Sequence, residues 1–126
     1  HQILKGLTPK LFEGSDKILR DFIYIEDIIQ ANIKACKPKK SGVYNVGTGN
    51  ARSFEDIVNI LQKELEIDNG KEYIPNPYVG SYQFFTEANI LTTKKFLDYE
   101  PRFSLEDGIK AYIPEIKRLF AEEVKW

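Results

Sequence analysis

The chain has 126 residues, of which 42% are apolar and 13% aromatic, so its composition is that of a globular chain rather than a disordered or membrane-spanning one. Its 18 basic and 19 acidic side chains leave a net charge of −1, without the basic excess that phosphate-driven binding to nucleic acid requires. One cysteine and one histidine exclude an internal disulfide and supply too few ligands for a zinc site. We therefore expect no metal centre, no nucleic-acid partner and no membrane association.

The N-terminal part of the sequence contains short segments of alternating type. Residues 2–7 read as the end of a helix closed by a glycine. Because the chain begins with His1 rather than methionine, we interpret it as a piece of a longer protein. An extended segment at residues 10–12 runs into a turn, and the β-branched and aromatic residues 22–25 predict a strand.

A helix and a second strand follow. Asp27, with Gln30 three residues later, fits the N-cap and capping-box partner of a helix that ends near Cys36. Residues 43–46 are predicted to form a short strand that leaves through two glycines.

The C-terminal half is richer in predicted helices. Ser53 fits an N-cap with Asp56 at the third helical position, and apolar residues then repeat at helical spacing as far as Leu65. A brief strand, a short helix and a last helix that Pro114 must bend or restart are predicted at residues 72–74, at residues 86–96 and from Ser104 onward. The alternation of strands and helices favours an α/β fold in which helices cover a small sheet.

The glycine-containing segment at residues 47–52 partly matches a dinucleotide-binding fingerprint, because it lies between a predicted strand and a predicted helix. Arg52 stands where the fingerprint needs a third glycine or an alanine for close packing. We therefore interpret this segment as a plain glycine turn rather than as a cofactor site.

Arg20 is a candidate for binding a diphosphate. It stands just before a predicted strand and follows the Gly14–Ser15 turn, so its planar guanidinium and the turn's backbone donors could hold the same group. The alternative is a surface arginine that is paired with Asp16 or Asp21. The residues alone do not decide between the two.

Several segments together resemble the C-terminal half of extended short-chain dehydrogenases/reductases that modify nucleotide sugars. Two of them are generic to that superfamily: residues 20–27 (RDFIYIED) and residues 44–47 (YNVG) before a capped helix. Two more, residues 10–15 (KLFEGS) and residues 82–89 (YQFFTEAN), make the sequence similar to the ADP-L-glycero-D-manno-heptose 6-epimerases. The similarity covers nearly the whole chain, in the family's order.

The resemblance implies a function in the synthesis of the lipopolysaccharide inner core. Enzymes of this family use tightly held NADP to oxidise the heptose at C6 and then return hydride to the opposite face, so the cofactor supplies the redox chemistry. Residue by residue, it implies that the ADP-sugar is bound by Phe12, Glu13, Gly14, Ser15, Arg20 and Tyr82.

Each of these residues has a plausible physical role. Phe12 can pack on a base or ribose, and Glu13 can accept hydrogen bonds from amino or hydroxyl groups. Gly14 permits close backbone approach, Arg20 neutralises the diphosphate, and Tyr82 can bond phosphate or sugar.

The catalytic pair of the superfamily, a tyrosine followed four residues later by a lysine, is missing from this sequence. The residues four places after its seven tyrosines are Ile28, Thr48, Pro77, Tyr82, Thr86, Phe103 and Ile116. We therefore predict no catalytic residue and no cofactor-binding residue within residues 1–126, which would form the C-terminal substrate-binding region of the parent enzyme.

A piece of this kind would contain a strand and helices of an incomplete Rossmann domain. The strand predicted at residues 43–46 would then lack its neighbours, and we expect self-association or marginal stability. For the intact parent, the family implies a homo-oligomer in the cytoplasm.

Two other functions stay open at this point. The parent could be a UDP- or dTDP-sugar epimerase or dehydratase, because Arg20 would serve any diphosphate, and only residues 12–15 favour adenine. Alternatively, the chain could be a non-catalytic module that binds a nucleotide sugar.

Overall fold

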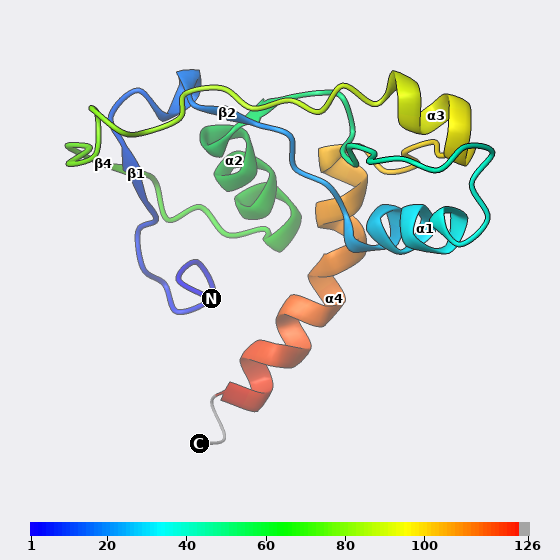
Figure 1. The fold of residues 1–126 in the computed structure, drawn as a ribbon. Helices are drawn as coiled ribbons and strands as arrows, with labels where there is room; N and C mark the ends of the chain where they lie inside the picture. Colours follow the sequence, from blue (N-terminus) through cyan, green and yellow to red (C-terminus); the bar gives the residue numbers. More distant parts are fainter. Residues whose placement is uncertain (124–126) are drawn as a thin grey trace.

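The chain forms two short strand pairs and four α-helices in the computed structural model, which describes residues 1–123 (Figure 1). Strand β1 (Lys10–Phe12) pairs in parallel with β4 (Glu72–Ile74), and β2 (Leu19–Arg20) pairs antiparallel with β3 (Arg52–Ser53). The helices are α1 (Ile25–Ala35), α2 (Phe54–Leu65), α3 (Leu91–Leu97) and α4 (Leu105–Glu123), and a 3-10 turn, η1, covers Ser15–Lys17. The predicted α/β fold is confirmed.

Two separate apolar clusters hold these elements together. Between α2 and α4, the buried side chains of Leu65 and Ile113 meet Ile3 from the N-terminal turns. Around α1 and α3, the buried cluster consists of Ala31, Ile90, Leu97 and Tyr99. Burying apolar surface in this way is the main favourable contribution to folding.

Helix α2 begins as its sequence predicts. The Ser53 Oγ accepts a hydrogen bond from the Asp56 amide at 3.0 Å, and the Asp56 carboxylate accepts one from the Ser53 amide at 3.1 Å. These two bonds satisfy backbone donors that a helix N-terminus otherwise leaves unpaired. The helix ends at Glu66, whose φ of 58° is the left-handed conformation common after helices.

Helix α1 begins three residues earlier than predicted, and Asp27 is not its N-cap. The N-cap is Tyr24, whose side chain makes no capping bond, and the predicted strand at residues 22–25 is wrong, because residues 21–24 are irregular. Asp27 is instead fully buried inside the first turn. Its carboxylate accepts hydrogen bonds from the backbone amides of Arg102 and Phe103 at 3.0–3.1 Å, so it holds the start of the segment before α4.

The strand predicted at residues 43–46 is also absent, and no strand pairs with this segment in the described part of the chain. Val43 is 97% exposed, whereas Tyr44 and Val46 pack against the α1–α3 cluster. A strand needs a hydrogen-bonded neighbour, so an apolar, β-branched sequence is not sufficient here. Whether the segment causes self-association stays a prediction.

Three other elements differ from their sequence predictions. The N-terminal residues 2–6 form turns, and the helix predicted from residue 86 begins at Leu91. Helix α4 is a single helix that contains Pro114, so this proline does not restart it. None of the described helices is long and apolar enough to cross a membrane.

Candidate functional site

A cavity of about 180 Å³ lies between β1, η1, the start of α2 and the segment before α3. We call it the aromatic cavity, because three aromatic rings help to line it; its walls are Lys10, Leu11, Phe12, Ser15, Ile18, Phe54 and Tyr82. The Phe12 and Tyr82 rings meet edge to face, with their centroids 5.9 Å apart. Binding sites for whole ligands usually measure roughly 300–1,000 Å³, so the aromatic cavity has room for only part of a nucleotide sugar.

Ser15 brings an unsatisfied polar group to this cavity. The residue is 2% exposed, and its Oγ is buried without a hydrogen-bond partner among the described residues. A buried hydroxyl without a partner costs free energy, so native proteins rarely leave one. A ligand that enters the aromatic cavity could supply the missing hydrogen bond.

Arg20 lies on the same side of the molecule as the aromatic cavity. Its guanidinium carbon is 5.5 Å from the centroid of the Tyr82 ring, and it donates hydrogen bonds to the backbone carbonyls of Leu19 and Gln83. Neither Asp16 nor Asp21 forms an ion pair with it in the described part of the chain. Its positive charge is therefore not balanced by a carboxylate, which counts against the surface-pair alternative.

The remaining two residues of the predicted site do not line the aromatic cavity. Glu13 is exposed, and its amide donates to the Ile74 carbonyl at 2.9 Å. Gly14 has a φ of 76° and leads into η1, so its position requires the left-handed conformation that glycine adopts easily. The structure thus brings together Phe12, Ser15, Tyr82 and Arg20, whereas Glu13 and Gly14 are not among the residues that line the cavity.

Phe54 and Lys10 also line the aromatic cavity, although their sequence positions did not predict it. Phe54 has the same helical spacing as the core residues of α2, so nothing in the sequence distinguishes a cavity wall from core packing. Its ring also packs edge to face on Phe22, with centroids 5.3 Å apart. Lys10 carries an exposed ammonium that is 3.5 Å from the Glu72 carboxylate.

The glycine turn at residues 47–49 does not fit a dinucleotide phosphate, because a carboxylate already occupies its amides. The Asp21 carboxylate accepts hydrogen bonds from the Thr48 amide at 2.8 Å, the Thr48 Oγ1 at 2.5 Å and the Gly49 amide at 2.9 Å. It also accepts one from the Ala88 amide at 3.1 Å. We call this arrangement the Asp21 clamp, and it agrees with the interpretation of the segment as a plain turn.

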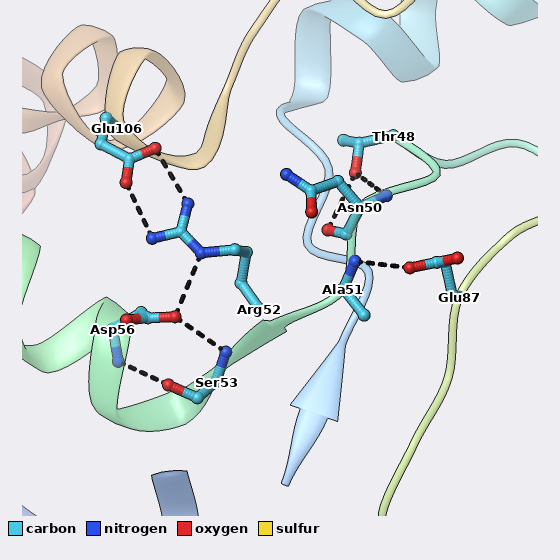
Figure 2. A network of polar contacts seen from close by, with 8 residues as sticks. All are labelled: Thr48, Asn50, Ala51, Arg52, Ser53, Asp56, Glu87 and Glu106. Carbon is cyan, nitrogen blue, oxygen red and sulfur yellow. Dashed lines mark hydrogen bonds and ion pairs between the residues drawn. The ribbon is translucent and has the colours of Figure 1, made fainter. Parts of the chain in front are cut away.

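Arg52, at the position of the absent third glycine, is bound by two carboxylates (Figure 2). Its guanidinium binds both carboxylate oxygens of Glu106 at 2.8 and 3.1 Å, and its Nε donates to Asp56 at 3.1 Å. The hydrogen bond from Arg52 lowers the pKa of the Glu106 carboxyl. Arg52 therefore joins the starts of α2 and α4.

The described residues also offer no place for a metal ion. No group of three or more histidine, cysteine, aspartate or glutamate side chains within residues 1–123 is arranged to hold one.

Comparison with known proteins gives consistent matches, although no family model matches the chain. ADP-L-glycero-D-manno-heptose-6-epimerase of Brachyspira hyodysenteriae is 37% identical over 121 residues, which are 94% of this chain and 38% of that protein. The crystal structure of ADP-L-glycero-D-manno-heptose-6-epimerase from Helicobacter pylori matches with a TM-score of 0.73 and 49% identity, and the match covers 87% of this chain and 33% of that one.

A third match comes from an enzyme that acts on another nucleotide sugar. UDP-glucuronic acid 4-epimerase from Bacillus cereus, solved in complex with UDP-glucuronic acid and NAD, has a TM-score of 0.81 and 31% identity. That match covers 94% of this chain and 38% of the other. The chain thus spans less than two fifths of the length of the relatives that it matches.

The α/β fold of this chain thus matches the C-terminal part of nucleotide-sugar epimerases of the extended short-chain dehydrogenase/reductase class. By sequence, the chain is homologous to the ADP-L-glycero-D-manno-heptose 6-epimerases, which confirms the resemblance seen in its motifs.

Proposed function

We propose that this chain is the substrate-binding region of an NADP-dependent epimerase that inverts C6 of the heptose in ADP-glycero-manno-heptose. The observation that carries the proposal is the position of the Arg20 guanidinium over the Tyr82 ring, beside an aromatic cavity with an unsatisfied Ser15 hydroxyl. The region that binds NADP lies outside residues 1–126 in this proposal, because the glycine turn of this chain is occupied by Asp21.

The proposal gives each part of the site one role. Arg20 neutralises the diphosphate, which suits a planar cation with several N–H donors and no acidic partner. Phe12 and Tyr82 provide flat apolar contact for the base or ribose, and Ser15 completes its hydrogen bond with the ligand. The parent enzyme would be a cytoplasmic homo-oligomer that acts in synthesis of the lipopolysaccharide inner core.

A second candidate has a specific observation in its favour. The B. cereus UDP-glucuronic acid 4-epimerase has a higher TM-score than the H. pylori ADP-heptose enzyme, 0.81 against 0.73, although its sequence identity is lower. Since Arg20 would bind any diphosphate, the parent could act on a UDP-sugar. Titrating ADP and UDP into this chain by calorimetry separates the two candidates, because only the base differs.

Replacing Arg20 should weaken nucleotide binding strongly. We expect Arg20→Ala to raise the Kd for ADP by about 10- to 100-fold, because it removes a charge-assisted contact with the diphosphate. The control is Lys110→Ala, which removes an exposed cation from α4 and should leave the Kd unchanged. Tighter binding of UDP than of ADP would support the second candidate, and no binding of either nucleotide would refute both.

The isolated chain should be unable to epimerise the ADP-heptose. It has no tyrosine followed four residues later by lysine, and the turn that resembles a cofactor site is filled by a carboxylate. We expect no inversion at C6 above the protein-free control when the chain is incubated with the ADP-heptose and NADP and followed by NMR. Turnover by the purified chain would overturn the proposed absence of catalytic residues.

A further inference from the structure

We propose that Glu55 is a positioning residue that sets the width of the aromatic cavity, an inference that rests on the nucleotide-binding role proposed above. The Glu55 Oε1 accepts a hydrogen bond from the Lys71 Nζ at 2.6 Å and another from the Tyr73 hydroxyl at 2.9 Å. Lys71 donates in addition to the Asn59 Oδ1 at 3.0 Å. One carboxylate in the first turn of α2 thereby holds Tyr73 of β4 and Lys71, the residue just before β4, and we call this group the Glu55 clasp.

The Glu55–Lys71 ion pair of the clasp is better shielded from solvent than the other ion pairs among the described residues, although Tyr73 is 47% exposed. The Glu55 and Lys71 side chains are 22% and 25% exposed, whereas every other described ion pair contains at least one side chain that is 38% exposed or more. Shielding strengthens an ion pair when its partners are also hydrogen-bonded, as they are here. The clasp is therefore better suited than an exposed ion pair to fixing the position of β4 relative to α2.

The clasp connects to the site through the β1–β4 pair. Tyr73 lies opposite Leu11, and Phe12 lies opposite Ile74. Leu11 and Phe12 both line the aromatic cavity. Figure 1 shows β1 and β4 beside α2. Because β4 pairs directly with β1, a displacement of β4 would also displace the β1 residues that line the cavity.

The other end of the clasp also reaches the cavity. Phe54 immediately precedes Glu55 in α2 and lines the aromatic cavity as well. Glu55 thus ties α2, which carries Phe54, to β4, whose partner strand β1 carries Phe12. Because binding sites depend on the placement of their walls to within about half an ångström, loosening this tie should weaken binding before it unfolds the chain.

The directions of the pKa shifts agree with the hydrogen bonds of the clasp. Hydrogen bonds from Lys71 and Tyr73 lower the pKa of the Glu55 carboxyl. The hydrogen bond to Glu55 in turn raises the pKa of Lys71 and that of Tyr73. The carboxylate stays ionised and both donors keep their protons.

A catalytic role for the same three residues is less consistent with these facts. A tyrosine that serves as a catalytic base needs a lowered pKa, and the pKa of Tyr73 is raised. Tyr73 and Lys71 do not line the aromatic cavity. The geometry therefore supports positioning rather than proton transfer.

The test compares Glu55→Ala, Glu55→Gln and a matched control, Glu115→Ala, in this chain. Glu115 pairs with Arg118 on α4, away from the aromatic cavity, so its removal also costs one acidic partner. Two quantities are measured: the Kd for ADP by calorimetry, and hydrogen exchange at the Glu13 amide, which donates to Ile74. The melting temperature of each variant is measured as well. If Glu55 only stabilised the fold, a Glu55 variant that melts at the same temperature as the control would show neither a changed Kd nor a changed exchange rate.

We expect Glu55→Ala to raise the Kd for ADP by about fivefold to tenfold, the equivalent of one lost hydrogen bond to a charged group, and to speed exchange at Glu13. In Glu55→Gln, the Kd and the exchange rate at Glu13 should stay close to those of the unchanged chain, because the amide oxygen still accepts hydrogen bonds from Lys71 and Tyr73. A Kd and an exchange rate that match those of Glu115→Ala would overturn the inference. If the unchanged chain binds no ADP, the proposed function fails. In that case the exchange measurement still tests the clasp, and an exchange rate at Glu13 that Glu55→Ala leaves unaltered would refute it.

Discussion

Replacing Asp21 by asparagine should cost about 2–4 kcal/mol of folding free energy, the largest effect that we expect from a single conservative change. The Asp21 carboxylate accepts four hydrogen bonds, from Thr48, Gly49 and Ala88. An asparagine offers one acceptor oxygen, and its amide group would face backbone N–H donors that need an acceptor. Chemical denaturation monitored by circular dichroism measures the loss.

Asp16→Asn is the matched control for this change. Asp16 is an exposed residue of η1, and its substitution should alter the free energy of unfolding by less than about 0.5 kcal/mol. Equal stabilities for the two variants would mean that the Asp21 clamp contributes nothing to folding.

The same clamp should make stability depend on acid. Burial acts to raise the pKa of Asp21, but the hydrogen bonds from Thr48, Ala88 and Gly49 outweigh it and lower the pKa below its ordinary value of 3.8. A carboxyl whose pKa is lowered in the fold stabilises the protein above its ordinary pKa, and this stability is lost as the pH falls through the lowered value. Below a pH of about 4, the wild type should therefore lose stability more steeply than Asp21→Asn.

Adding one methyl group at Gly47 should be nearly as damaging, with an expected cost of about 3 kcal/mol. A Cβ there would lie 2.5 Å from both the Ala88 Cβ and the Asp21 Oδ2, far inside contact distance. Gly47 has no room to retreat, because its carbonyl accepts a hydrogen bond from the buried Tyr99 hydroxyl at 2.7 Å. Thermal melting of Gly47→Ala measures the effect.

Gly80→Ala provides the control, since a Cβ at Gly80 meets nothing within 4 Å and should change stability by less than about 0.5 kcal/mol. Gly47→Ala and Asp21→Asn disturb the same contacts, so the double variant should lose less stability than the two single losses together. A cost that equals the sum would indicate that the two sites are independent.

Structural features that depend only on residues close together in the sequence could be predicted from it. The capping box of α2 needs only Ser53 and Asp56, and the structure has both of its hydrogen bonds. The parallel partners β1 and β4 were both expected as extended segments, at residues 10–12 and 72–74. Their pairing was not predicted, because register depends on residues far apart in the chain.

Features that depend on distant partners could not be predicted. Asp27 followed by Gln30 fits a capping box, but the carboxylate of Asp27 binds amides 75 residues further on, and no local pattern shows this. The strand at residues 43–46 was predicted from its β-branched residues, although a strand also needs a neighbour.

Some residues of the candidate site could be predicted from the sequence, and others could be found only in the structure. Motif resemblance indicated residues 12–15, Arg20 and Tyr82, and the structure brings Phe12, Ser15, Tyr82 and Arg20 together. Phe54 reaches the cavity only through the packing of α2, and the unsatisfied Ser15 hydroxyl is visible only in three dimensions.

The buried Asp27 and the half-buried Asp21 also constrain how the chain folds during synthesis. The Asp21 carboxylate accepts a hydrogen bond from the amide of residue 88, and the Asp27 carboxylate accepts hydrogen bonds from the amides of residues 102 and 103. Contacts between residues so far apart slow folding, because the intervening chain must first be ordered. During synthesis, residue 88 must therefore leave the ribosome before the Asp21 carboxylate has all its donors, and residue 103 before the Asp27 carboxylate has its own.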